Sequence, residues 1–371
     1  MKVVIDISRL SSKALKRGEG IYAQSLCQAL KELENGNQYQ LKKEKGKAFD
    51  RVDICHYPYF NPFFIQIPWW QKEKRIITVH DLTPLKFPRH YPPGLRGGLK
   101  WQLQKWFLRR APAIITDSQS SREDIISLVA CSPKKVFVIP LAVDEQFKEL
   151  ETGNCLARPD LALREKQKIR QKYSLPDKFI LYAGDLNWNK NVGGLVKAFH
   201  NVKSQSQPTL DGVETKSGIL KLVLVGAAFR DSELLELKKL EKLIEELDLK
   251  NQVLKLGFVP KEDLVRLYNL ASLYIQPSYY EGFGLPVLEA MSCGCPVLCS
   301  DQASLPEIGG RAVVYFNPYQ QGELASKIKE LLTNPARLDR LAQKGLRQAR
   351  KFSWRQTAQE TAKVYKEVFK K

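Results

Sequence analysis

Two glutamates that lie eight positions apart flank a glycine-containing turn in the stretch 274–300, YIQPSYYEGFGLPVLEAMSCGCPVLCS. We predict an apolar strand before the turn and a helix after it, and Gly282 and Gly284 allow the backbone to turn sharply. The free amides at a helix start can hold a phosphate. Glu281 in the turn and Glu289 in the helix can accept hydrogen bonds from hydroxyl groups. These residues suit a nucleotide sugar, although acidic residues also occur at helix starts because they favour the helix dipole.

The same stretch resembles the Glu-x7-Glu signature of retaining glycosyltransferases of family 4. Glu281 and Glu289 stand at the two acidic positions, with GFGLPVL between them. The resemblance implies that Glu281 holds hydroxyls of the donor sugar and that Glu289 holds the ribose. We expect the backbone of the turn to contact the donor diphosphate through Phe283, Gly284 and Leu285.

Three other segments resemble the same family. The GEGIY segment, with Gly18 and Gly20, is similar to the glycine loop that approaches the donor phosphates and the acceptor. The TVHD segment matches a strand end whose histidine lines the reaction centre, which implies a catalytic role for His80. The GFVP segment resembles the loop that reads the nucleobase, which implies a contact at Val259. His56 is a weaker candidate, expected to face the same cleft.

A basic side chain follows a predicted strand in the second half of the chain. The loop GDLNWNKN begins at Gly184, and Lys190 in it suits a diphosphate, although a lysine there could also be only solvated. The family typically has an arginine in this region as well, but its usual places hold Asp185 or Asn189 here. We leave open whether another cation, such as Arg230, compensates.

The N-terminal segment begins with a strand over Val3–Ile7, a glycine loop and a helix, as a nucleotide-binding unit does. Asp6 is unusual within such a strand. The loop lacks the third glycine of the dinucleotide fingerprint, and no acidic residue ends a clear second strand about 20 residues later. We therefore do not expect a dinucleotide.

The formal net charge of +19 requires a polyanionic partner, which could be nucleic acid, an anionic membrane surface or phosphorylated substrates. The segment 82–116 contains no acidic residue, and aromatic residues alternate with its basic ones. Its helix, predicted over Leu95–Arg110, either packs as an ordinary surface helix or also touches anionic lipid. No nucleic-acid motif is present, so we expect no nucleic-acid partner.

A length of 371 residues favours two domains, and 43% hydrophobic residues is ordinary for a globular protein. We expect no signal peptide, and no apolar stretch reaches the ~18–20 residues of a membrane span. The seven cysteines are scattered, and Cys293-x-Cys295 lacks the paired ligands of a zinc site. We predict reduced cysteines, no cofactor and no metal. We also predict a cytoplasmic location, either free or peripheral on the inner face of the membrane.

The alternation of strands and helices in both halves predicts an α/β protein of two Rossmann-like domains, whose parallel sheets face each other across a cleft in the GT-B architecture. We predict an acceptor-side domain over 1–175, with a helix over 353–371 packing back on it, and a nucleotide-sugar domain over 176–352. The predicted function is retaining, metal-independent transfer of a hexose, with mannose as our choice, from a GDP- or UDP-linked donor to a glycan or polyprenyl-linked acceptor. The alternatives are a sugar-nucleotide epimerase and a basic nucleic-acid-binding protein.

Overall fold

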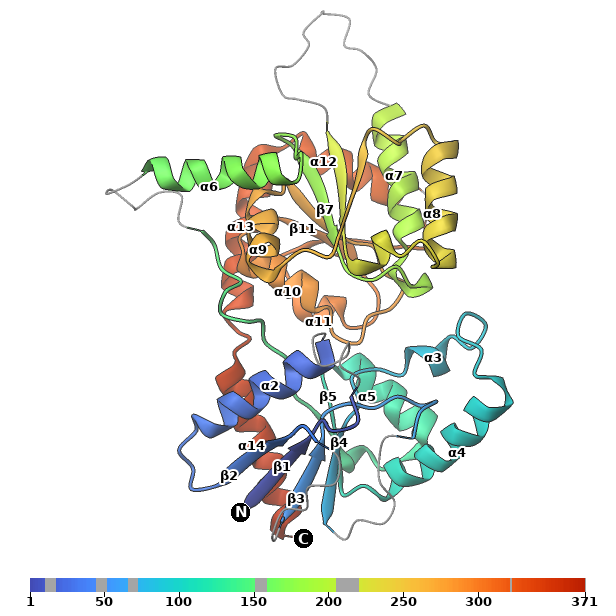
Figure 1. Ribbon diagram of the computed structural model, residues 1–371, viewed down its shortest axis with the longest axis vertical. Helices are drawn as coiled ribbons and strands as arrows, with labels where there is room; N and C mark the ends of the chain where they lie inside the picture. Colours follow the sequence, from blue (N-terminus) through green and yellow to red (C-terminus); the bar gives the residue numbers. More distant parts are fainter. Residues whose placement is uncertain are drawn as a thin grey trace, which may run out of the picture. The chain divides into compact units, whose positions relative to one another are not determined.

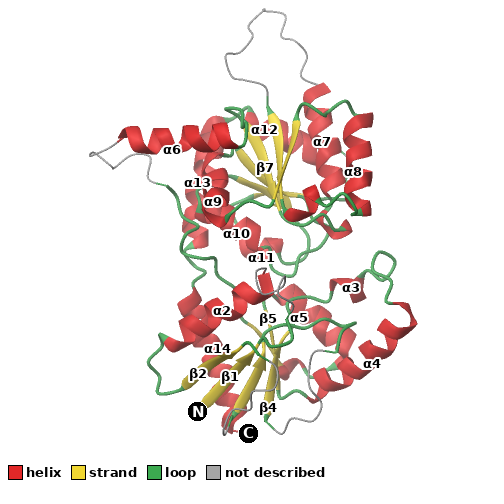
Figure 2. Cartoon of the chain, in the orientation of Figure 1, coloured by secondary structure: helices red, strands yellow, loops and turns green. Residues whose placement is uncertain are grey.

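The computed structural model describes most of the chain, namely residues 1–10, 18–44, 52–65, 73–150, 159–204, 220–320 and 322–370. The chain forms two compact units. One comprises 1–142 together with 352–371, and the other comprises 143–351. Helices lie on both sides of the strands in each unit (Figure 2).

The first unit is built on a six-stranded parallel sheet with the order β2-β1-β3-β4-β5-β6. Its strands are β1 (Lys2–Asp6), β2 (Gln38–Lys42), β3 (Ile54–Tyr57), β4 (Lys74–Thr78), β5 (Ala113–Thr116) and β6 (Val136–Val138). Its α-helices are α2 (Gly18–Lys31), α3 (Thr83–Lys86), α4 (Gly94–Arg110), α5 (Gln119–Ile125) and α14 (Trp354–Lys370). Helix α14 returns to this unit and packs beside α2 (Figure 1), as predicted for the C-terminal helix.

The second unit contains another six-stranded parallel sheet, with the order β12-β11-β10-β7-β8-β9. Its strands are β7 (Phe179–Ala183), β8 (Lys221–Val225), β9 (Val253–Gly257), β10 (Leu273–Gln276), β11 (Val297–Ser300) and β12 (Val314–Phe316). Its α-helices are α6 (Pro159–Lys172), α7 (Val192–Ser204), α8 (Leu235–Glu246), α9 (Lys261–Leu270), α10 (Leu285–Ser292), α11 (Leu305–Gly309), α12 (Glu323–Leu332) and α13 (Pro335–Ala349). The carboxyl ends of parallel strands meet at one edge of a sheet, which is where such proteins place ligands.

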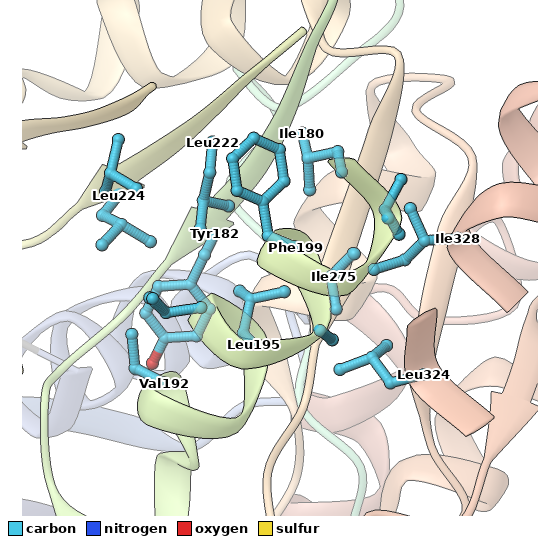
Figure 3. Packing of buried hydrophobic residues seen from close by; sticks show 14 of the residues in the cluster. Ile180, Tyr182, Val192, Leu195, Phe199, Leu222, Leu224, Ile275, Leu324 and Ile328 are labelled. Atoms are coloured by element: carbon cyan, nitrogen blue, oxygen red, sulfur yellow. The ribbon is translucent and has the colours of Figure 1, made fainter. Parts of the chain in front are cut away.

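The core of the second unit forms where α7 packs against the sheet. Leu195 and Phe199 are four positions apart, so they lie on one face of the helix. They lie close to Ile180 of β7 and Leu222 of β8 (Figure 3), and all four side chains are fully buried. Buried apolar area of this kind is the main stabilising term of a fold. It fixes the strand ends and the loops that follow them.

The predicted domain boundary at residue 175 is wrong, because the division between the units lies after residue 142. The segment that follows residue 142 bonds to the second unit. The ring of Phe147 packs edge-on against Tyr268, and the backbone nitrogen of Leu150 donates to Asn269. Lys172 at the end of α6 donates to Asp263 of α9. Polarity and weak periodicity made this segment resemble a linker, whereas its tertiary contacts attach it to the second sheet.

Strand β2 is not among the strands that the sequence pattern predicts. Among the described strands it pairs with β1 alone, at the edge of the sheet, and its residues, QYQLK, are polar enough to resemble a loop. It ends in Lys42, whose amine lies 3.7 Å from Asp6. Asp6 also accepts hydrogen bonds from the backbone and hydroxyl of Ser8. These contacts account for a carboxylate in an otherwise apolar strand.

Candidate functional site

Lys190 and Glu281 form an ion pair at the carboxyl edge of the second sheet. Lys190 follows β7, Glu281 follows β10, and the lysine Nζ lies 2.7 Å from Oε2 of the glutamate. The other carboxylate oxygen, Oε1, accepts hydrogen bonds from Gln276 and Ser278, both at 2.7 Å. Glu281 is only 6% exposed. Three donors therefore hold a nearly buried carboxylate in one orientation, as a binding site requires.

A second set of contacts holds the turn that carries Glu281. The side-chain amide of Asn189 donates to the carbonyl of Tyr280, and that of Asn191 donates to the carbonyl of Pro277. Ser304 donates to the carbonyls of Glu281 and Phe283. Asn189 stands at one of the places where the family has an arginine. Here it ties the loop after β7 to the loop after β10.

Gly284 directly precedes α10 and has a backbone conformation that favours glycine. Its φ is +98°, in the left-handed region, and an added Cβ would lie 2.7 Å from the end of the Leu305 side chain. The glycine lets the chain turn directly from Glu281 into the helix. Phe283 is buried, whereas Leu285 in the first turn is partly exposed. The predicted donor contacts at these three residues therefore lie at the start of the helix, where amides have no helical partner.

Glu289 lies one turn inside α10 and has a separate partner. The hydroxyl of Tyr268, from α9, donates to its Oε2 at 3.0 Å. Burial raises the pKa of Glu289 to about 7, and the hydrogen bond from Tyr268 opposes this shift only in part. The two glutamates of the signature therefore differ in surroundings. Glu281 is held by a cation and two donors, and Glu289 by one phenol.

His80 and Asp117 form the corresponding polar centre of the first unit. Each follows a neighbouring strand, β4 and β5, and Nδ1 of the histidine lies 2.6 Å from Oδ2 of the aspartate. The other ring nitrogen faces the carbonyl oxygen of Pro58 at 3.2 Å. Since a carbonyl can only accept, that nitrogen carries a proton. Burial alone would lower the pKa of His80, but the charge and hydrogen bond of Asp117, together with the charges of Glu19 and Asp81, outweigh burial and raise it to about 9.

Two further residues of α2 lie near His80. The ring of Tyr22 meets the imidazole edge-on at 4.9 Å between centroids. Burial raises the pKa of Glu19, and the charge of His80 opposes this rise only in part. Gly20 is buried and Gly18 is exposed at the start of α2. A Cβ added to Gly18 would meet nothing within 4 Å, so packing inside this unit does not require the glycine.

His56 has a structural environment. It is fully buried in β3, where Nδ1 lies 2.7 Å from the hydroxyl of Tyr365 and Nε2 lies 2.7 Å from the hydroxyl of Thr78. Burial lowers its pKa to about 3, so the ring is neutral. Both nitrogens have protein partners. The residue connects α14 to the sheet, which does not support the weaker prediction that it faces a ligand.

The remaining predicted residues lie at the same edge of the second sheet. Gly184 directly follows β7 and donates its backbone N–H to Val225. Val259, two residues beyond β9, is buried, whereas the neighbouring Phe258 is 78% exposed. Arg230 is exposed, and its aliphatic chain lies over Gly257 at the end of β9. Lys190 and Arg230 therefore both follow strands of one sheet edge.

Sequence reasoning missed the partners that hold the predicted residues. Asp117, Gln276, Ser278 and Tyr268 are ordinary polar residues without a motif, and only the fold brings them to the site. A strand end beside His80 was the one available signal for Asp117.

Within the described ranges, no three His, Cys, Asp or Glu side chains cluster as a metal site would. The helices of those ranges also lack the length and apolar composition of a membrane span.

Two family models match the chain. "Glycosyltransferase Family 4" matches residues 22–147, and "Glycosyl transferases group 1" matches residues 164–348. The chain is 30% identical to the O-antigen chain mannosyltransferase B of Escherichia coli over 329 residues, which cover 88% of this chain and 79% of that protein. It is also 32% identical to the serotype-specific mannosyltransferase WbdA of E. coli. That match covers 79% of this chain but only 33% of the longer WbdA.

Solved structures match the fold of the whole chain. Sucrose-phosphate synthase from Thermosynechococcus elongatus is similar with a TM-score of 0.74 and 19% identity, over 99% of each chain. HepE of Anabaena in complex with UDP-glucose is similar with a TM-score of 0.72 and 18% identity, over 99% of this chain and 100% of that one. These matches and the two parallel sheets confirm the predicted GT-B fold class. Together with the sequence matches, they show that the chain belongs to glycosyltransferase family 4.

Proposed function

We propose that the protein is a retaining hexosyltransferase that moves mannose from a nucleoside diphosphate sugar to a glycan or polyprenyl-linked acceptor. The observation that carries this proposal is the pairing of Lys190 with Glu281 at the start of α10. The cation suits a diphosphate, and the carboxylate suits sugar hydroxyls. The names of the two E. coli relatives support mannose as the sugar.

The proposed reaction breaks the bond between the sugar C1 and the diphosphate oxygen. Lys190 and the amides at the start of α10 would stabilise the negative charge of the leaving diphosphate. The acceptor oxygen would bond to C1 on the face from which the diphosphate leaves, and its proton would pass to a donor phosphate oxygen. This course retains the configuration at C1. Because the sequence contains no Asp-x-Asp, we propose that these groups act without a metal.

The donor base is proposed to lie near Val259, with its ribose on Glu289. GDP-mannose is the donor we propose, and UDP-hexoses are the alternative, since the similar HepE structure contains UDP-glucose. His80 would lie beside the reacting sugar. Since burial raises the pKa of Glu289 to about 7, its carboxylate becomes a stronger acceptor for ribose hydroxyls as the pH rises through 7.

The proposed setting is the synthesis of a cell-surface polysaccharide. The name of the O-antigen mannosyltransferase relative supports it. A polyprenyl-linked acceptor stays in the membrane, so the enzyme would work in the cytoplasm at an anionic membrane surface. Water-soluble nucleotide sugar would reach it from the cytoplasm.

Kinetics of Lys190→Ala test the proposal. The lysine acts on charge that grows in the transition state, so the variant should lose turnover by more than its KM for the donor rises. Lys238→Ala on α8, where the lysine is exposed, is the matched control. Proton NMR of the product should show the anomeric configuration of the donor. Unchanged turnover at saturating donor, or an inverted product, would contradict the proposal.

A further inference from the structure

Exposed apolar side chains gather at one place on the first unit. Among the described residues, eleven large hydrophobic side chains are exposed, and six of them lie on α4 or in the adjoining segment 61–65. We call these six the apolar stripe: Phe64, Ile65, Leu95, Leu99, Leu103 and Trp106. Helix α4 lies at the edge of its unit (Figure 1). Exposed apolar side chains that gather on one helix and the segment beside it mark an interaction surface.

The four helical members of the stripe share one face of α4. At about 100° per residue, positions 95, 99, 103 and 106 fall within roughly 80° of one another. Leu95 is 91% exposed and Leu99 is 75% exposed. The buried residues occupy the opposite face, namely Gly97, Gln104, Phe107 and Leu108. One face of the helix is therefore buried in its own unit, and the described residues of that unit leave the apolar face exposed.

The helix is held firmly in this orientation. The side-chain amide of Gln104, which is fully buried, donates to the carbonyls of Asn61 and Phe64. Arg109 donates to the carbonyl of Val129 at 2.7 Å. These bonds join α4 to two parts of its unit, the segment 61–65 and the residue Val129. The stripe is exposed because α4 docks through its other face.

Basic side chains flank the stripe, and no acidic residue lies within 82–116. The guanidinium of Arg110 lies 3.8 Å from the centroid of the Trp106 ring, and the amine of Lys100 lies 5.5 Å from that of Phe64. The other basic residues of α4 are Arg96, Lys105 and Arg109. Apolar residues with cations along their sides match the boundary of an anionic bilayer, where acyl chains lie beneath charged headgroups.

We propose that the apolar stripe of α4 inserts into the headgroup layer of an anionic membrane, with the flanking lysines and arginines on lipid phosphates. A second copy of this chain fits less well, because each copy would bring the same cluster of positive charge. A membrane supplies both the apolar layer and the negative charge. The stripe supplies the docking surface for the membrane partner of the proposed function, since it would hold the enzyme beside a lipid-linked acceptor.

Vesicle flotation of the full chain tests this proposal. Wild type should float with vesicles of phosphatidylglycerol and phosphatidylcholine, and much less with phosphatidylcholine alone. The double variant Leu95→Ser/Leu99→Ser should lower the partition coefficient at least tenfold, since each leucine contributes apolar burial. Leu235→Ser on α8 is the matched control, because Leu235 is 58% exposed in the other unit. It should bind as wild type does.

A second pair of variants tests the charges. Arg96→Glu/Lys100→Glu should abolish the preference for anionic vesicles, whereas Lys238→Glu/Lys239→Glu on α8 should keep it. Wild-type recovery that is equal with both vesicle types, or full binding by the leucine variant, would overturn the proposal. A third result would also overturn it: a wild-type protein that does not bind vesicles, is a dimer by light scattering, and becomes a monomer in the Leu95→Ser/Leu99→Ser variant.

Nucleotide binding keeps this test separate from the proposed function. The leucine variant should bind nucleoside diphosphates with wild-type affinity, because the stripe and the ion pair of Lys190 lie in different units. Loss of vesicle binding with intact nucleotide binding assigns the defect to docking. A protein that binds vesicles but neither GDP nor UDP would refute the proposed function and leave the docking surface standing.

Discussion

Lys190 and Glu281 share one hydrogen bond of 2.7 Å, although the sequence suggested separate ligand groups for them. The sequence pattern predicts a diphosphate at the lysine and sugar hydroxyls at the glutamate. Because the two side chains touch, the two subsites of the proposed function would adjoin beside the start of α10. It also means that each side chain keeps a charged partner when no donor is bound, which limits the cost of holding a nearly buried carboxylate.

We expect Lys190 and Glu281 to be coupled in stability. In Lys190→Ala the buried carboxylate would keep Gln276 and Ser278 as its donors among the described residues, and would lose its charged partner. This variant should lower the free energy of unfolding by roughly 1–3 kcal/mol. In Glu281→Gln the carboxylate is already absent, so adding Lys190→Ala should cost less. Urea unfolding of wild type, the two single variants and the double variant measures the coupling. If the losses in the free energy of unfolding were additive, the pair would contribute nothing.

We expect the pH to control nucleotide affinity through Glu289. Its pKa of about 7 means that the carboxylate fraction rises between pH 6 and 8. An ionised acceptor binds ribose hydroxyls more strongly, so affinity for a nucleoside diphosphate should increase over this range. Glu289→Gln should weaken binding and remove this part of the dependence. Calorimetry at pH 6 and pH 8 measures the nucleotide affinity of wild type and Glu289→Gln. The nucleotide itself also titrates in this range, but this affects both proteins equally and cancels in the comparison.

The same carboxyl should affect stability in the opposite direction. Its folded pKa lies above the ordinary value of 4.5, so the folded state keeps a proton that the unfolded state loses. The contribution of this group to the free energy of unfolding therefore falls as the pH rises from 4.5 through about 7. Glu289→Gln should flatten that slope. Glu236→Gln on α8 is an exposed control that should leave it unchanged.

We expect His80 to remain charged at neutral pH because of Asp117. Its pKa of about 9 lies above the ordinary 6.5, so its contribution to stability is complete below pH 6.5 and is lost as the pH rises through 9. In Asp117→Asn, burial should move this pKa below 6.5. NMR titration can resolve the ring, since the sequence has only four histidines. A His80 signal titrating near 6.5 in both proteins would refute the pair.

Gly284→Ala should destabilise the second unit. The residue has a φ of +98°, and the new Cβ would lie 2.7 Å from the end of the Leu305 side chain. We expect a loss of about 1–3 kcal/mol. Gly193→Ala in α7 is the matched control, since its Cβ would meet Leu243 at an ordinary 3.8 Å. That variant should gain about 0.5–1 kcal/mol. Equal Tm shifts in thermal unfolding would contradict the argument.

Local pattern was sufficient for most of the fold. Short apolar runs predicted the buried strands of both sheets, since a parallel strand is covered on both faces. The same pattern failed at β2, an edge strand with polar residues. It also placed the division between units too late. The charged segment after residue 142 is attached by Phe147 and Lys172, whose partners on α9 lie about a hundred residues away.

The sequence by itself determined the family and the alternation that specifies two parallel sheets. It also placed His80, Lys190 and Glu281 after strands and Glu289 near the start of a helix. These features depend on residue order over short distances. Tertiary structure alone decided which groups hold them. Asp117 lies 37 positions from His80, and Lys190 lies 91 positions from Glu281. Such pairs meet only because sheet order, set by burial of whole strands, brings separate loops to one edge.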